Sequence, residues 1–239
     1  MGKPLRSILL QLFTILIWLA ACSTPVYPAP EGYYLTSSPG NRISRKIHEV
    51  EAGESIRLFA NKGRYLDPEY MQVDVSSWTV SPIKEVSIDG EGVLTTGVDV
   101  PHQTRLTVMA HTKYGVITDD VLVYSLAQNP LVGAWKEVNQ PNCGAPDLIE
   151  ELEFLAGGRF NVTWHPFEFN VDYYGNYSFD LDERSLTFLD VQESSNLPTD
   201  LEVSAGAFYI DDQSRLILED MHLGNGGDFP CEHYIFERR

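Results

Sequence analysis

Residues 148–165 read LIEELEFLAGGRFNVTWH, and this stretch decides how the carboxy-terminal half of the chain folds. The residues before and after Ala156-Gly157-Gly158 alternate in ways typical of short β-strands, with Phe160, Val162 and Trp164 on one face. The small residues between them suit a tight turn. The stretch therefore predicts a β-hairpin.

The same pattern of short strands and turns continues on both sides of this hairpin, across residues 131–239. It predicts eight consecutive strands: Val132–Val138, Leu148–Leu155, Arg159–His165, Tyr173–Asp180, Ser185–Asp190, Glu202–Asp211, Arg215–Glu219 and Glu232–Arg238. Strands joined in sequence by short connections suit a closed up-and-down barrel, because closure leaves no exposed sheet edge. An eight-stranded antiparallel β-barrel is the predicted fold of this half.

The start of this region, Leu131-Val132-Gly133-Ala134-Trp135, resembles the opening of a lipocalin-like domain, whose first strand carries Gly-x-Trp. The later stretches LEFLAGGRF, YYGNYSFD, LILED and YIFER follow in the order that the resemblance requires. The resemblance implies structural roles for Gly133 and Trp135. It further implies that the tryptophan packs by a cation–π contact against an arginine of the last strand. Arg238 is the first candidate for that arginine and Arg239 the second.

The preceding region, residues 44–126, shows short alternating strands broken by turns and no helical periodicity. It resembles the bacterial Ig-like domains of surface proteins through VEAGE, SSWTVSP, VSIDGEGVLTTG, TRLTVMAHT and VLVYSL. That resemblance implies a two-sheet antiparallel sandwich with Trp78 buried in its core, and no catalytic residues. The whole mature chain is thus expected to be all-β, with two modules that meet near residues 127–130.

The amino terminus has the layout of a secretion signal. Lys3 and Arg6 precede an apolar run over residues 8–19, which is shorter than the ~20 residues of a membrane-spanning helix. The run ends at Leu19-Ala20-Ala21-Cys22, which looks like the lipobox of bacterial lipoproteins. Residues 1–21 are therefore expected to be a signal peptide and Cys22 a lipid-attachment site. The alternative is an ordinary secretory signal with a chance cysteine.

A lipid on Cys22 would tether the mature protein to a membrane without spanning it. Ser23 follows the cysteine where an aspartate usually signals inner-membrane retention, so the resemblance favours the outer membrane of the bacterial envelope. Residues 22–43 contain several prolines and no apolar period. We expect them to form a flexible, extended tether.

The formal net charge of the chain is −17 at pH 7. This charge makes nucleic acid and anionic lipid surfaces unsuitable partners. Two interpretations of the acidity remain: it keeps an exported protein soluble, or it attracts a basic protein partner.

Two cysteines remain after Cys22, namely Cys143 and Cys231. In an oxidising compartment an even pair favours a structural disulfide, and no Cys-x-x-Cys motif suggests metal binding. Cys143 follows the first barrel strand and Cys231 begins the last one. Because first and last strands are neighbours in a closed barrel, the bond would staple the seam.

No sequence motif for a cofactor, metal or nucleophile is present: the six histidines show no ligand spacing, and no G-x-S-x-G, Walker or dinucleotide motif occurs. Glu150 is the one acid considered for hydrolysis, since one register of its strand turns it into the apolar barrel. Ile149 offers the competing register, which leaves Glu150 in solvent. We therefore expect no enzyme, no cofactor and no metal.

Five aromatic residues on the second hairpin strand and the next strand are candidates for a ligand pocket: Phe160, Trp164, Tyr173, Tyr177 and Phe179. Eight-stranded barrels are either filled by side chains or hold one small molecule, so the same residues also fit a plain barrel core.

Two function classes follow from the sequence. The favoured one is a non-catalytic envelope lipoprotein that acts in binding or scaffolding, whose barrel carries either a recognition surface or a pocket for a small apolar ligand. The alternative is an acidic inhibitor or accessory subunit that docks a basic envelope protein or hydrolase.

Overall fold

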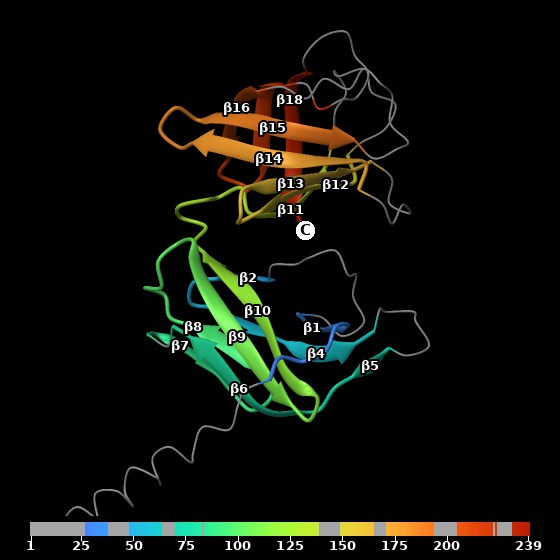
Figure 1. Ribbon diagram of the computed structural model, residues 1–239. Coiled ribbons are helices and arrows are strands. Elements are labelled where there is room, and N and C mark those ends of the chain that lie inside the picture. The colour runs from blue at the N-terminus through green and yellow to red at the C-terminus, as the bar shows by residue number, and fades with distance from the viewer. Residues whose placement is uncertain are drawn as a thin grey trace, which may run out of the picture.

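The computed structural model describes residues 27–37, 48–63, 70–82, 84–138, 149–164, 171–193, 205–221, 223 and 231–239. They form two β-modules, one stacked on the other (Figure 1). Every regular element in these ranges is a strand, so the all-β prediction is confirmed for the described part of the chain. These residues also contain no helix of the length and apolarity needed to cross a membrane.

The second module is a closed antiparallel barrel of eight strands. The strands are β11 (Gly133–Glu137), β12 (Glu151–Leu155), β13 (Arg159–Thr163), β14 (Tyr173–Asp180), β15 (Ser185–Glu193), β16 (Ala205–Ile210), β17 (Leu216–Met221) and β18 (Cys231–Arg238). Each strand pairs with its neighbour in sequence, and β11 pairs with β18 to close the ring. The predicted barrel, with its strand count and its seam, is confirmed.

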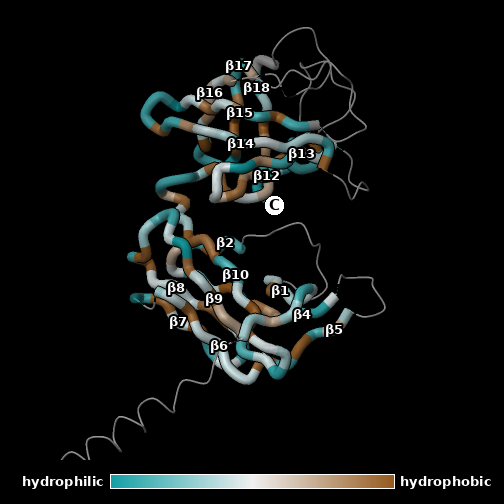
Figure 2. The backbone as a smooth tube through the Cα atoms, in the orientation of Figure 1, coloured by the Kyte–Doolittle hydropathy of each residue, from teal (hydrophilic) through white to brown (hydrophobic). Residues whose placement is uncertain are grey.

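Alternate residues of each barrel strand point inward and form one apolar core. On β11 the inward position falls on Trp135, which lies opposite Arg238 of β18. Leu152 and Phe154 of β12 face Val162 and Phe160 of β13 across the hairpin, and all four are fully buried. Figure 2 shows the resulting change between apolar and polar residues along the strands.

The acidic turns of the barrel are held by their own side chains. Asp180 Oδ1 accepts hydrogen bonds from the backbone N–H groups of Asp182 and Glu183, both at 2.9 Å. Asp211 accepts bonds from the backbone of Gln213 and Arg215 and pairs with the Arg215 guanidinium at 2.7 Å. These aspartates therefore serve turn geometry, which is their usual role.

The first module contains three sheets, with strand orders β1-β4-β5, β2-β10-β9-β6 and β3-β8-β7. Its strands are β1 (Tyr33–Thr36), β2 (His48–Glu51), β3 (Ser55–Arg57), β4 (Phe59–Lys62), β5 (Met71–Gln72), β6 (Val75–Ser81), β7 (Val86–Ile88), β8 (Val93–Thr96), β9 (Thr104–Thr112) and β10 (Gly115–Tyr124). Leu58 alone separates β3 from β4, so one continuous segment joins the two smaller sheets. All three sheets contribute side chains to a single core.

This arrangement differs from the predicted two-sheet antiparallel sandwich. The described strands divide into three sheets, and β2 runs parallel to β10. The parallel pair joins residues far apart in the chain, such as Val50 and Val123, so no local turn signal announces it. Trp78, predicted to be buried in the core, is only partly buried and packs against the core cluster.

The prediction of a tether over residues 22–43 is wrong for Tyr33–Thr36, which form β1 and pair with β4. Leu35 is 3% exposed and belongs to the core, and the His48 ring nitrogen lies 3.3 Å from the Leu35 carbonyl oxygen. The sequence pattern does not indicate this strand, because only Leu35 of β1 is buried and several prolines lie on either side of it.

Candidate functional site in the barrel

The five predicted pocket residues all lie in or against the barrel core. Phe160 and Tyr173 are fully buried and Tyr177 is nearly so, while Trp164 and Phe179 pack against the same cluster from its edge. The Phe160 and Phe188 ring centres are 4.3 Å apart. These contacts favour the filled-core interpretation, although Tyr177 and Phe179 also line a hollow together with His102 and Gln103 of the first module.

The barrel is sealed at one end by Trp135 and Arg238. The Arg238 guanidinium lies 4.3 Å from the centre of the Trp135 ring, so the predicted cation–π contact is confirmed. Trp135 is fully buried, and its indole N–H donates to the Leu131 carbonyl at 2.7 Å. Arg238 also donates to the carbonyls of Val132 and Pro130, at 2.6 and 3.0 Å.

Gly133 makes room for this arginine. Its φ is +131°, a conformation that residues with a side chain rarely adopt. A methyl group at this position would lie 2.5 Å from Arg238 Nη1. The glycine and the tryptophan of Gly-x-Trp therefore serve the same contact.

Glu137, two residues beyond Trp135, brings a carboxyl group into the barrel. It is 2% exposed, because the strand period of two gives it the same inward face as Trp135. Its Oε2 accepts a hydrogen bond from the Ile149 N–H at 2.7 Å, and its Oε1 is buried without a partner among the described residues. The alternation from Trp135 could have revealed this residue, but the sequence interpretation considered Glu150 instead.

Burial raises the pKa of Glu137 to about 7, and the Ile149 N–H opposes the rise in part. Burial also raises the pKa of the nearby Tyr173 hydroxyl, with smaller contributions from Tyr234, Asp172 and Glu137. The hydroxyl of Tyr173 donates to the Leu223 carbonyl at 2.6 Å. The barrel thus contains an acid that is largely neutral below pH 7 and that lies near the buried Tyr173.

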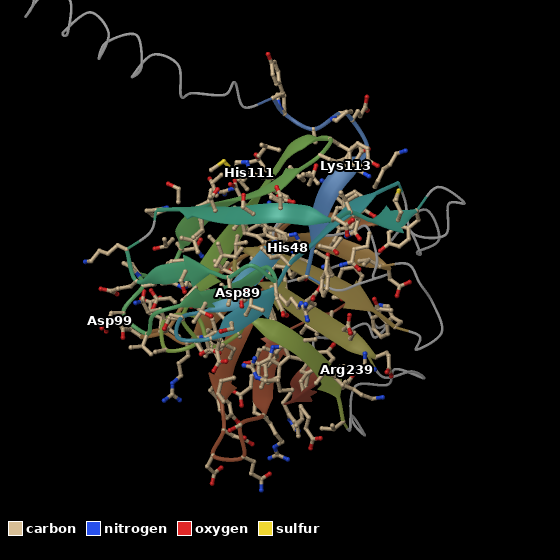
Figure 3. The ribbon with its side chains drawn as sticks, turned by 90° about the horizontal axis from the view of Figure 1, so that it is seen from below. His48, Asp89, Asp99, His111, Lys113 and Arg239 are labelled. Atoms are coloured by element: carbon tan, nitrogen blue, oxygen red, sulfur yellow. The ribbon has the colours of Figure 1, made fainter. Side chains whose placement is uncertain are left out.

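Glu150 lies on the outside of the barrel. Its carboxylate pairs with Lys136 at 2.8 Å and with Arg239, which is labelled in Figure 3. Ile149 takes the buried position instead and is fully inaccessible. The competing register is therefore the one observed, and Glu150 contributes to ion pairs on the surface.

Three of the predicted site residues are cysteines. Cys22 and Cys143 lie outside the described residues, and Cys231 begins β18 opposite Met221. Lipid attachment and the disulfide stay predictions. Figure 3 shows His48 and His111 apart from each other in the first module, and the residues that the structure describes contain no three-ligand cluster suited to a metal ion.

The first module binds the barrel at the β12–β13 turn. The Glu49 carboxylate accepts hydrogen bonds from the N–H groups of Ala156 at 2.9 Å and Gly157 at 3.4 Å. Gln103 donates to the Ala156 carbonyl at 2.5 Å. A small apolar cluster of Leu122, Val132 and Ala156 completes this junction.

No protein-family model and no curated protein matches the chain.

The raised pKa of Glu137 predicts a pH-dependent stability. Between about pH 4.5 and 7 the folded barrel holds a proton on Glu137 that the unfolded chain has released, so stability falls as pH rises through this window. The shift corresponds to about 3 kcal/mol. We expect Glu137→Gln to match the wild type at pH 4.5 and to unfold at a higher temperature at pH 8, as measured by calorimetry of the barrel transition.

The matched control is Glu150→Gln, which neutralises an acid on the outer face and should bring no gain at pH 8. Equal pH dependence in wild type and Glu137→Gln would contradict the assignment of this window to Glu137.

Proposed function

We propose that this chain is a non-catalytic binding lipoprotein of the bacterial envelope, anchored in the outer membrane through lipid on Cys22. In this proposal a bacterial Ig-like module carries a lipocalin-like barrel. The first module is the base, and the barrel carries the recognition surface.

The observation that carries the proposal is the junction between the modules. Glu49 and Gln103 hold the backbone of the β12–β13 turn by three hydrogen bonds, and apolar contacts surround them. The barrel is thereby held through one of its turns, and Figure 1 shows β14 and β15 running across the molecule above β11–β13, which lie nearer the first module. Such an arrangement suits the presentation of a binding module.

The lipocalin-like assignment draws support from the contact between Trp135 and Arg238 and from the room that Gly133 gives to the arginine. The Ig-like assignment draws support from a β-module with one shared core. Both assignments rest on these features together with the sequence motifs.

The anchor is tested by Cys22→Ser. We expect the wild type to partition with membranes and to incorporate labelled palmitate, and the variant to lose both properties because the acyl chains supply the membrane affinity. Membrane partition and palmitate labelling of the variant at wild-type levels would contradict the anchor.

A second candidate function, docking of a basic protein partner, is favoured by the charge of four segments of the sequence. Residues 138–150, 164–172, 194–204 and 222–230, most of which lie outside the described residues, contain no Lys or Arg. Their acids are Asp147, Glu150, Glu168, Asp172, Asp200, Glu202 and Asp228, of which Glu150 is paired with Lys136 and Arg239. Acidic segments of this kind attract basic partners and make the association sensitive to salt.

Immobilised polylysine tests this candidate. Replacing Asp147, Asp200 and Asp228 by Asn should weaken binding about tenfold at low salt, since each acid adds to the negative charge of these segments. The matched control replaces Asp182, Glu183 and Asp212, in the β14–β15 and β16–β17 turns, by their amides. Equal losses from the two sets would show a non-specific charge effect and contradict docking through these segments.

A further inference from the structure

The amino-terminal part of the described chain is fixed to β10. The Ala29 N–H donates to the Val116 carbonyl at 2.8 Å, and the Val116 N–H donates to the Tyr27 carbonyl at 2.9 Å. Gly115 allows this close approach, because a Cβ there would lie 2.9 Å from backbone atoms of Pro28 and Ala29. The chain is therefore attached to the first module from Tyr27 onward.

This attachment lies at the end of the first module that faces away from the barrel. β9 starts next to Gln103, which binds the barrel, and runs for nine residues, about 30 Å, to Thr112. β10 returns from Gly115, so the β9–β10 turn is at the far end of both strands (Figure 1). Tyr27 therefore lies remote from the junction between the modules.

The reach from the proposed lipid to this end is short. Tyr27 lies five residues after Cys22. A chain spans at most ~3.6 Å per residue, so the two residues are separated by no more than about 18 Å, whatever the conformation between them. The headgroup region of a bilayer is itself about 5–8 Å thick. The far end of the first module thus stays within reach of the lipid headgroups, whereas a tether that extended to residue 43 would let the module rise much further.

The surface at this end is rich in tyrosine. Tyr27 is 68% exposed and Tyr114 38% exposed, and the ring centres of Tyr33 and Tyr114 are 5.2 Å apart. The Lys113 ammonium lies 4.9 Å from the centre of the Tyr114 ring, and Figure 3 looks onto this end and shows Lys113 next to β1. Met71 is 45% exposed and lies in the same row as Tyr33 across the sheet β1-β4-β5. We call these five residues the tyrosine end.

Side chains of these types suit the interface between membrane and water. A tyrosine buries its ring and keeps its hydroxyl in water, and a lysine extends its ammonium group to the headgroups. Charged residues beside the tyrosine end in the described chain come in equal numbers, Lys62 and Lys113 against Glu31 and Asp74. The full chain, by contrast, has a net charge of −17. The tyrosine end therefore avoids the repulsion that the rest of this acidic chain meets at a bilayer.

We propose that the tyrosine end lies in the headgroup region of the membrane that holds the Cys22 lipid. The first module then stands on the bilayer and directs the barrel away from it. This contact rests on the lipid anchor of the proposed function and adds a second attachment to it. The occupant of the surface is a lipid bilayer, and a second copy of the chain is the competing outcome of the experiment.

Fluorescence quenching by brominated lipids tests this orientation, with the full lipidated chain in phosphatidylcholine vesicles whose acyl chains carry bromine just below the headgroups. Tyr114→Trp places a fluorophore at the tyrosine end and keeps its amphipathic character. We expect most of the fluorescence that this variant adds to the wild type to be lost in brominated vesicles. The matched control is Leu181→Trp, in the β14–β15 turn, where the native residue is 43% exposed. Its added fluorescence should persist.

Further substitutions separate the effect of the surface from that of the short linker. Tyr27→Ser and Met71→Ser, added to Tyr114→Trp, should restore most of the fluorescence, because they remove apolar surface that enters the bilayer and leave the linker unchanged. Val98→Ser is the control for them, since Val98 is 77% exposed and lies between β8 and β9, at the junction end of the module. It should leave the quenching of Tyr114→Trp as it is.

Absence of bromine quenching in Tyr114→Trp, in a protein that still incorporates palmitate and partitions with membranes, would overturn the proposal and leave the anchor intact. Equal quenching of Tyr114→Trp and Leu181→Trp would overturn it as well. A dimer in detergent that Tyr27→Ser dissociates, without quenching in vesicles, would assign the surface to a second copy and likewise overturn the proposal. Failure of the anchor itself shows separately, as loss of palmitate labelling in the wild type, and would contradict both attachments.

Discussion

The packing of the Arg238 guanidinium on the Trp135 ring is the contact on which the rest of the barrel depends. It joins the first strand to the last across the seam, and the same guanidinium binds the carbonyls of Pro130 and Val132, where the chain enters the barrel. A cation–π contact that is partly shielded from water contributes about 1–2 kcal/mol. Its larger effect is on register, because it places Trp135 opposite Arg238 and thereby decides which residues of both strands face inward.

That register explains two other features of the molecule. It turns Glu137 into the barrel beside Phe236, which gives the interior its one acid on β11. It also leaves Arg238 at the end that faces the first module, where burial lowers its pKa and the neighbouring Tyr124 and Glu51 oppose that fall. The seam of the barrel and the junction between the modules therefore share one residue.

Much of this architecture is predictable from sequence, because it depends on local patterns. The eight strands, their order and the pairing of the first strand with the last follow from the alternation of apolar and polar residues, the turn residues and the Gly-x-Trp motif. The sequence did not decide whether Glu150 faces the barrel interior or the solvent. Ile149 and Leu152 are both buried, and no strict period of two connects them. The strand at Tyr33–Thr36 was missed because it is stabilised by a distant partner, β4. No sequence pattern marks Asn129, because its hydrogen bond to the Tyr177 hydroxyl joins the segment between the modules to a distant barrel strand.

The most direct test of the central claim is a double-mutant cycle between Trp135 and Arg238, using Trp135→Leu, Arg238→Met and the double variant. Amide hydrogen exchange of β11 and β18 gives the opening free energy of the seam in each protein, without requiring both modules to unfold together. We expect a coupling energy of about 1–2 kcal/mol in favour of the native pair. Effects that add to within ~0.5 kcal/mol would show that the two residues stabilise the barrel independently, and would contradict the seam contact as its organising interaction.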